Sequence, residues 1–232
     1  MKDLFGKAIL DFQTNNSPSA LITETNISEA DEMAVEYLFR SYNQMPNLEQ
    51  KAIQLTKGKT LDVGCGAGSH ALYLQEKGFE VMAIDISANA IKACELRGLK
   101  NVKVQNILDV ENEKFDTILL LMNGTGIFGT LSETSKYLQK LKSLLNPNGQ
   151  ILIDSSDIIY MFDEEEDGSF SVPADRYYGE LTFTISYKNK TEEPFPWLYL
   201  DYNTLQNAAH DNGLQCELIL EGAHFDYLAK LF

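Results

Sequence analysis

Residues 60–68 read TLDVGCGAG, and this stretch decides the fold. It begins with a small apolar strand, Leu61 to Val63, that carries one acid, Asp62, and it continues with alternating glycines at 64, 66 and 68. Glycines between a strand and a helix let the chain reverse sharply and let backbone amides approach a ligand. The stretch therefore predicts a strand, a tight turn that carries a cofactor, and a helix under way by Ala71.

The register of the glycines indicates which cofactor. A dinucleotide fingerprint, G-x-G-x-x-G, counted from Gly64 would place its third glycine at Ser69, and a Walker A loop needs a lysine that the stretch lacks. The remaining pattern, acid-x-G-x-G-x-G, resembles the first motif of the class I S-adenosylmethionine-dependent methyltransferases. The resemblance runs from Lys59 to Asp154 and continues more weakly to the end of the chain.

Composition indicates one α/β domain with an insertion, and it favours a small-molecule or protein substrate. The 232 residues include 19 basic and 34 acidic ones, and the net charge of −15 would repel the phosphates of a nucleic acid. No apolar run reaches the ~20 residues of a membrane span and no signal peptide is evident, so we expect a cytoplasmic protein without a membrane partner. The three scattered cysteines predict neither a disulfide framework nor a metal site.

An acid follows the glycine turn at the spacing that ribose recognition requires. The second strand, Phe79 to Ile84, ends at Asp85, about 20 residues beyond the glycines, where a carboxylate can accept hydrogen bonds from both ribose hydroxyls. The alternative role of Asp85 is to cap the helix that opens near Ser87. A helix from Ala88 to Arg97 and a third strand, residues 102–104, come next.

Adenine recognition falls after the third strand. The family usually has an acid there, followed by an apolar residue beside the ring, and this chain has Asn106 and Ile107. The asparagine amide oxygen can accept from the adenine amino group, with less charge assistance than a carboxylate. Asp109, three residues later, is the alternative adenine partner.

The fourth strand ends beside the expected methyl-transfer centre. Residues 118–122 form a continuous apolar run typical of a strand buried on both faces, and Met122, Asn123 and Gly124 follow at its carboxyl end. This segment is not the N/D-P-P-Y/F motif of the methyltransferases that act on DNA or rRNA. Asn123 either orients a substrate or is a turn residue. A helix capped by Ser132 and a fifth strand, residues 150–154, complete this part.

The N-terminal residues are the least patterned. Residues 1–27 have weak periodicity and are interpreted as a mobile arm or lid. Ser28 and Asp31 form a capping-box pattern, which predicts a helix to about Asn43, and a second helix covers residues 48–55. Tyr37 and Arg40 either face a ligand or belong to a helix that packs on the core with its arginine in solvent.

An insertion interrupts the alternation of strands and helices. Its acidic stretch, residues 163–167, is expected to be a solvated loop. Residues 181–187 alternate apolar and polar side chains, and residues 194–200 return as an aromatic strand, so we expect an antiparallel hairpin above the cofactor crevice. Phe195, Trp197 and Tyr199 share one face of it. These rings either cap the active site or pack on the fifth strand or on a second subunit of a homodimer.

The resemblance implies a complete fold. We expect a Rossmann-like α/β protein with a seven-stranded mixed sheet of order 3-2-1-4-5-7-6, its last strand antiparallel, helices on both faces, an N-terminal helical extension and the inserted hairpin. The four segments are an arm and helical cap (1–57), the S-adenosylmethionine-binding core (58–156), the inserted cap (157–202), and a final helix with two strands (203–232).

The resemblance also implies the activity: in-line transfer of a methyl group from S-adenosylmethionine to an O, N, S or C nucleophile of a small molecule. No histidine is assigned a catalytic role. Two alternatives stay open, a cofactor-binding sensor without turnover and, less favoured, a nicotinamide oxidoreductase. The expected cofactor contacts are Asp62, Gly64, Cys65, Gly66, Gly68, Asp85, Ile86, Asn106, Ile107 and Met122, and the expected substrate contacts are Asn123, Trp197, Tyr37 and Arg40.

Overall fold

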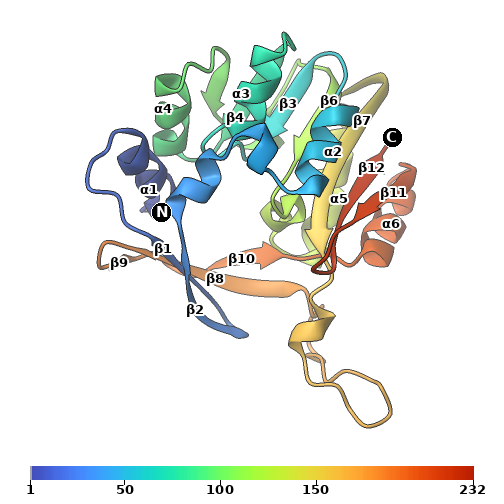
Figure 1. The fold of residues 1–232 in the computed structure, drawn as a ribbon. Helices are drawn as coiled ribbons and strands as arrows, with labels where there is room; N and C mark the ends of the chain where they lie inside the picture. Colours follow the sequence, from blue (N-terminus) through green and yellow to red (C-terminus); the bar gives the residue numbers. More distant parts are fainter. Residues whose placement is uncertain (1) are drawn as a thin grey trace.

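The computed structural model describes residues 2–232 and contains two β-sheets (Figure 1). The larger sheet has seven strands in the order β5-β4-β3-β6-β7-β12-β11. β12 is antiparallel to both of its neighbours, whereas β3 to β7 pair in parallel. This confirms the predicted strand order and the reversed last strand. The strands are β3 (Thr60–Val63), β4 (Val81–Asp85), β5 (Val102–Val104), β6 (Phe115–Leu120), β7 (Leu145–Ser156), β11 (Cys216–Glu221) and β12 (Asp226–Leu231).

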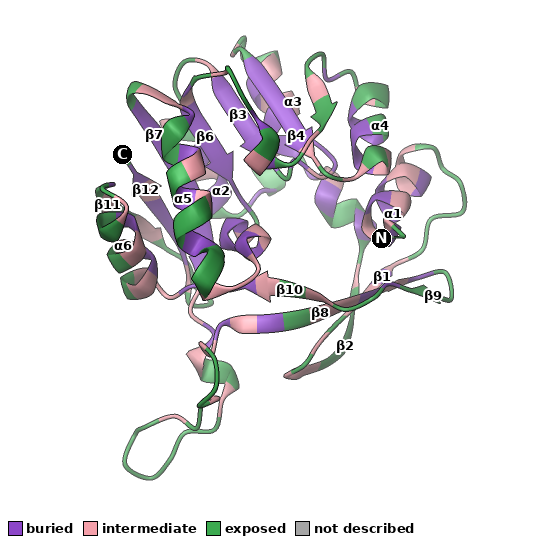
Figure 2. Ribbon diagram, turned by 180° about the vertical axis from the view of Figure 1, so that it is seen from behind, coloured by how far each residue is buried: buried purple, intermediate pink, exposed green. Residues whose placement is uncertain are grey.

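Helices cover both faces of this sheet because its central strands are apolar on both sides. Ile118 and Leu120 of β6 pack in the cluster that contains α5 (Thr134–Ser143) and α6 (Tyr202–Asp211). Leu119, between them, packs in the opposite cluster, with α2 (Asn47–Leu55), α3 (Ser69–Glu76) and α4 (Ala88–Leu96). The strands are therefore buried, and the helices expose their outer sides (Figure 2).

The smaller sheet lies across the carboxyl-end side of the large one (Figure 1). β8 (Glu180–Tyr187) and β10 (Phe195–Leu198) form the expected antiparallel hairpin, and β9 (Lys190–Thr191) extends it. The hairpin continues into β1 (Leu21–Thr25) and β2 (Ser28–Met33), which gives the order β10-β8-β1-β2. We call these five strands the cap sheet. One of its faces is buried, with Leu181 and Ile185, while Thr182 on the other is exposed.

The prediction of a mobile arm over residues 1–27 is wrong for the part that the structure describes. Residues 4–13 form helix α1 (Leu4–Gln13), which packs against α4, and Leu4, Ala8 and Ile9 are buried there. β1 then pairs with β8, far along the chain. The weak local periodicity is explained by partners about 160 residues away, which no local pattern reveals.

The predicted helix over residues 28–43 is also wrong. Residues 28–33 form β2, paired with β1 so that Leu21 lies opposite Met33, and two short 3-10 turns follow, η1 (Val35–Phe39) and η2 (Tyr42–Gln44). The Ser28 hydroxyl contacts the hydroxyl of Thr25 in the β1–β2 turn at 2.7 Å instead of capping a helix. Strand pairing overrides the local helical pattern here. Segment 1–57 is therefore not a purely helical cap.

Smaller differences concern element ends. α5 begins at Thr134 without a side-chain cap, and the predicted cap, Ser132, instead shares a 3.0 Å hydroxyl contact with Thr130. The second helix, α2, follows Pro46 closely as expected. Residues 163–167 are exposed, as predicted. Within residues 2–232, no helix combines the length and apolar character that crossing a membrane requires.

Candidate active site

The glycine turn after β3 is open toward the cap sheet side. Gly64 and Gly66 have φ angles of 69° and 53°, and a Cβ added at either would meet no atom within 4 Å. At Gly68, with φ 79°, a Cβ would lie 2.6 Å from Leu99 and 2.9 Å from the Cys94 sulfur. The first two glycines therefore leave room for a ligand over the backbone, and the third permits close packing against α4.

Asp85 at the end of β4 holds this turn. Its Oδ2 accepts a hydrogen bond from the Gly66 amide at 2.9 Å, and its Oδ1 accepts one from the Ser87 amide at 2.8 Å. Burial raises the pKa of Asp85, while those two amides favour its charged form. Ser87 provides the side-chain cap of α4 itself, at the Ala90 amide. The neighbouring Ile86 is an exposed apolar residue, 62% accessible.

Asp62 lies buried in β3 behind the turn. Its Oδ2 has no hydrogen-bond partner within residues 2–232. Burial raises the pKa of this carboxyl, and the nearby positive charge of His70 works in the opposite direction. A buried carboxylate oxygen without a donor is costly unless a ligand supplies one.

The segment after β5 contains both candidate adenine partners. The Asn106 side-chain oxygen accepts from the Leu108 amide at 2.9 Å and so caps the short turn η3 (Ile107–Asp109). Ile107 is buried in the core cluster with α5. Asn106 and Asp109 are both exposed. The side-chain oxygen of Asn106 is thus engaged locally, and the choice between the two residues remains a prediction.

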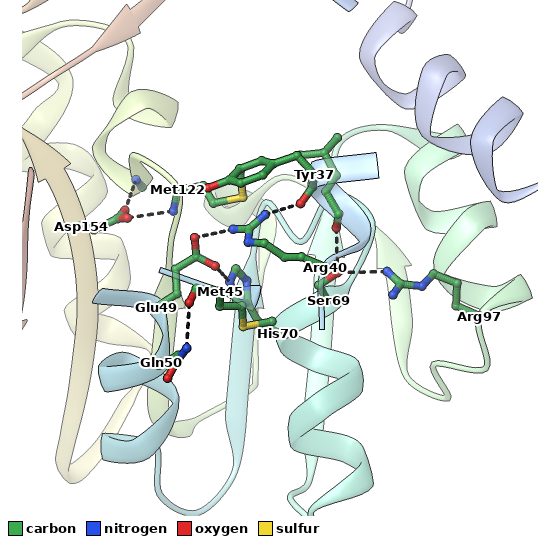
Figure 3. Close-up of polar contacts among 12 residues, drawn as sticks. Tyr37, Arg40, Met45, Glu49, Gln50, Ser69, His70, Arg97, Met122 and Asp154 are labelled. Carbon is green, nitrogen blue, oxygen red and sulfur yellow. Dashed lines mark hydrogen bonds and ion pairs between the residues drawn. The ribbon is translucent and has the colours of Figure 1, made fainter. Parts of the chain in front are cut away.

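A buried charge cluster joins the N-terminal segment to α2 and α3 (Figure 3). An Arg40 guanidinium nitrogen bonds Glu49 Oε1, and Glu49 Oε2 lies 2.6 Å from His70 Nε2. Burial opposes the charged forms, yet their mutual contacts lower the pKa of Glu49 and raise that of His70. Sequence reasoning did not find this cluster, because nothing in the local patterns pairs positions 40, 49 and 70.

Arg40 is buried, so the alternative of a helix packed on the core with its arginine in solvent is wrong. Its guanidinium lies 4.2 Å from the ring centroid of Tyr37, which is 44% exposed. Arg40 Nε has no partner within residues 2–232. A buried guanidinium with a free N–H on the carboxyl-end side of the sheet can receive a ligand carboxylate.

Asp154 of β7 fixes the turn that follows β6. Its two oxygens accept from the amides of Met122 at 3.0 Å and Gly124 at 2.9 Å (Figure 3). Met122 and Asn123 adopt left-handed φ angles of 68° and 59°, which these bonds help to hold. Burial raises the pKa of Asp154 to about 7. This residue too was missed, since a strand acid carries no distinguishing motif.

Asn123 and Trp197 connect this turn to the cap sheet. The Asn123 amide donates to the Leu198 carbonyl at 3.3 Å and accepts from the Ser155 hydroxyl at 3.0 Å. Trp197 packs so closely on the turn that a Cβ at Gly126 would overlap its ring. Phe183 contacts the rings of Phe195, Trp197 and Tyr199, with centroids 6.0–6.4 Å apart.

Several predicted residues thus gather at one edge of the large sheet. The glycine turn and Asp85 contact each other, Arg40 donates to the Tyr37 carbonyl at 2.7 Å, and Met122 follows β6, the strand beside β3. Cys65 and Cys94 are buried thiols, and the side-chain hydrogen bond with Cys94, together with burial, raises the pKa of Cys65. Among residues 2–232, no group of three or more histidines, cysteines and acids is placed to hold a metal ion.

The residues present fit S-adenosylmethionine. The orphan oxygen of Asp62 and the free N–H of Arg40 complement an ammonium and a carboxylate, and the open glycines accept a ligand over the backbone. Exposed Ile86 offers an apolar contact beside Asp85. These are the groups that an amino acid joined to a nucleoside requires.

Comparison with known proteins places the chain in a family. Residues 55–194 match the family model described as a methyltransferase domain. A crystal structure of an S-adenosylmethionine-dependent methyltransferase from Bacteroides fragilis, in complex with S-adenosyl-L-homocysteine, is 47% identical, with a TM-score of 0.92 over 100% of this chain and 94% of that one. The chain therefore belongs to the S-adenosylmethionine-dependent methyltransferases, and S-adenosylmethionine is its cofactor.

More distant relatives agree with the fold. The CcbJ methyltransferase from Streptomyces caelestis is 16% identical, with a TM-score of 0.62 over 81% of this chain and 89% of that one. The putative methyltransferase YqeM from Bacillus subtilis is 25% identical over 104 residues, which are 42% of each chain. The match to this curated relative thus spans less than half of its length.

Proposed function

We propose that the protein transfers the cofactor's methyl group to a nucleophile of a small molecule bound between the glycine turn and the cap sheet. A sulfonium methyl group is already activated, so the protein must mainly hold the acceptor in line with the S–CH3 bond. The observation that carries this proposal is the cap sheet itself, whose apolar face covers the carboxyl end of a cofactor-binding sheet. Ligands of open α/β sheets bind at that end.

We further propose how the cofactor lies. Asp85 accepts from the ribose hydroxyls, and Ile86 contacts the adenine face with Asn106 or Asp109 at its edge. Asp62 and Arg40 receive the ammonium and carboxylate of the methionine part. Their partnerless polar atoms support this orientation.

The substrate-facing residues of this proposal are Tyr37, Met122, Asn123 and Trp197. Tyr37 is half exposed on the N-terminal side, and Trp197 comes from the cap sheet on the other. Asn123 joins the two sheets through its hydrogen bond to Leu198. The alternative for Trp197, supported by its packing on Gly126, is a purely structural ring.

Replacing Trp197 with alanine distinguishes a role in acceptor selection from a purely structural role. If the cap selects the acceptor, Trp197→Ala should keep cofactor affinity within about threefold while turnover falls at least ~100-fold, or acceptor preference changes, in a screen of small phenols, amines and carboxylic acids. Pro196→Ala is the matched control, since the Pro196 side chain is exposed on the same strand. Loss of stability in Trp197→Ala with unchanged activity per folded molecule would contradict an acceptor role. Tight cofactor binding with no acceptor in the whole screen would instead favour a sensor.

A further inference from the structure

Two exposed rings stack beside the carboxyl end of β7. Tyr160 lies in the short turn η6 (Ile159–Met161), and Phe225 lies in the turn between β11 and β12. Their ring centroids are 5.0 Å apart with planes at 19°, and the two residues are 51% and 61% exposed. Figure 1 shows both segments on the cap-sheet side of the large sheet. Exposed apolar side chains that gather in a patch commonly mark a place where a folded protein interacts with another molecule.

The backbone at Phe225 is built to present its ring. Phe225 has a φ angle of 59°, a left-handed conformation that bulky residues rarely adopt. Its carbonyl accepts a hydrogen bond from the Asp157 amide at 2.9 Å, which ties the turn to the segment after β7. Strained backbone held by such a contact is typical of binding sites.

Tyr199 lies beside the carboxyl end of β7. Its neighbour Leu198 accepts at its carbonyl from the Asn123 amide at 3.3 Å, and its neighbour Leu200 donates its amide to the hydroxyl of Ser155, the residue after Asp154, at 2.9 Å. Within residues 2–232, no hydrogen bond engages the Tyr199 hydroxyl. By contrast, Tyr178 donates its hydroxyl proton to Asp157 at 2.8 Å. The Tyr199 hydroxyl is therefore available to a ligand.

The charges around these rings are negative and unpaired. Within the described residues, Asp157 forms no ion pair with a basic side chain. The single basic residue between positions 157 and 187, Arg176, pairs with Asp175 at 3.8 Å. The exposed acidic loop 163–167 belongs to the same segment. Aromatic faces and uncompensated carboxylates together attract cations.

We propose that Tyr160, Tyr199 and Phe225 form the acceptor subsite and that the acceptor is a small primary or secondary amine, captured as its ammonium ion. This inference rests on the proposed methyl transfer. The ammonium first releases a proton to water at the exposed side of the rings. The nitrogen lone pair then forms the N–CH3 bond as the S–CH3 bond breaks, and that bonding pair stays on sulfur to give S-adenosylhomocysteine. The methylated ammonium can release one further proton to water.

Calorimetric titration of the protein saturated with S-adenosylhomocysteine tests this subsite. Benzylammonium and benzoate are the probes, since they share a ring and differ in charge. We expect benzylammonium to bind at least about tenfold more tightly than benzoate, and Phe225→Ala to weaken it about tenfold, the scale of a cation–π contact. Phe232→Ala, which removes another exposed phenylalanine, 50% accessible against 61% for Phe225, should leave the affinity unchanged.

Equal or tighter binding of benzoate, or equal effects of Phe225→Ala and Phe232→Ala, would overturn the amine subsite. If Phe225→Ala fails to fold, Tyr160→Ala removes the other half of the stack and carries the same expectation. Saturating the protein with S-adenosylhomocysteine before the amine titration distinguishes the two proposals. A protein that binds no S-adenosylhomocysteine contradicts the proposed function itself. A protein that binds S-adenosylhomocysteine but no amine contradicts only the subsite.

Discussion

Gly66 and Gly78 have similar backbone constraints but different surroundings. Both have positive φ angles, 53° and 88°, and a Cβ at either would meet nothing within 4 Å. Gly66 lies on the turn held by Asp85, whereas Gly78 follows α3 at the opposite end of that helix. Open space over Gly66 therefore lies on the proposed cofactor turn, whereas open space over Gly78 lies at the far end of α3.

Substitution of these glycines should separate strain from ligand exclusion. Gly66→Ala and Gly78→Ala should each reduce the free energy of unfolding by about 1 kcal/mol, the cost of a left-handed alanine. Only Gly66→Ala should weaken S-adenosylhomocysteine binding, by at least ~10-fold, because its methyl group occupies the ligand's position. Thermal melts and calorimetry on both variants measure the two effects, and equal binding losses would refute the open-turn interpretation.

Asp154 makes stability depend on pH. Its folded-state pKa is about 7, above the ordinary 3.8, so the folded state retains this proton at pH values where the unfolded chain has lost it. This proton therefore stabilises the folded state fully below pH 3.8, and the stabilisation is lost as the pH rises to 7. Over that range the free energy of unfolding should fall by at most about 4 kcal/mol.

Asp154→Asn should lack this dependence because its amide does not titrate. Urea unfolding of both proteins at pH 5, 6, 7 and 8 should show wild type losing stability relative to the variant up to about pH 7 and levelling off beyond it. Groups shared by both proteins cancel in this difference. A difference that is constant across the series would mean that Asp154 titrates normally in the folded protein.

Helices, strands and turns were predicted correctly where the hydrophobic period or the residue spacing that indicates them lies within a short stretch of sequence. The glycine turn, α2, the alternating strands of the large sheet and the β8–β10 hairpin were each predicted from short patterns, and strand order followed from the family resemblance. Sequence reasoning failed over residues 2–43, because β1 and β2 gain their structure from β8, and α1 from α4. Asp154 and the Arg40–Glu49–His70 cluster were missed for the same reason, since their partners are distant in sequence.

Helix α1 therefore contributes to the stability of the protein. Ile9 is fully buried against α4 and the cap sheet, so Ile9→Ala should lower the free energy of unfolding by about 2–5 kcal/mol. Leu96→Ala, at a residue 51% exposed on α4, should cost far less. Chemical denaturation measures both variants, and similar small losses would restore the interpretation of residues 2–27 as a detached arm.

At the scale of the whole molecule, two sheets enclose the site from different directions. The large sheet supplies the glycine turn and the Met122–Asn123 turn, and strand β10 of the cap sheet supplies Trp197, whose ring packs against Gly126, and the Leu198 carbonyl that accepts from Asn123. The cap sheet combines β1 and β2, near the start of the chain, with strands of the insertion that follows β7, so the proposed acceptor site would draw on segments far apart in sequence. The net charge of −15 favours the approach of cationic over anionic ligands to the molecule as a whole.

Calorimetric titration of wild type and Asp85→Ala with S-adenosylhomocysteine and NAD tests the central claim most directly. We expect wild type to bind one equivalent of S-adenosylhomocysteine and to give no heat with NAD. Asp85→Ala should bind S-adenosylhomocysteine roughly ten- to a hundredfold more weakly, because a charge-assisted hydrogen bond contributes about 1.5–3 kcal/mol. Binding of NAD to wild type, or S-adenosylhomocysteine affinity equal in the two proteins within about threefold, would contradict it.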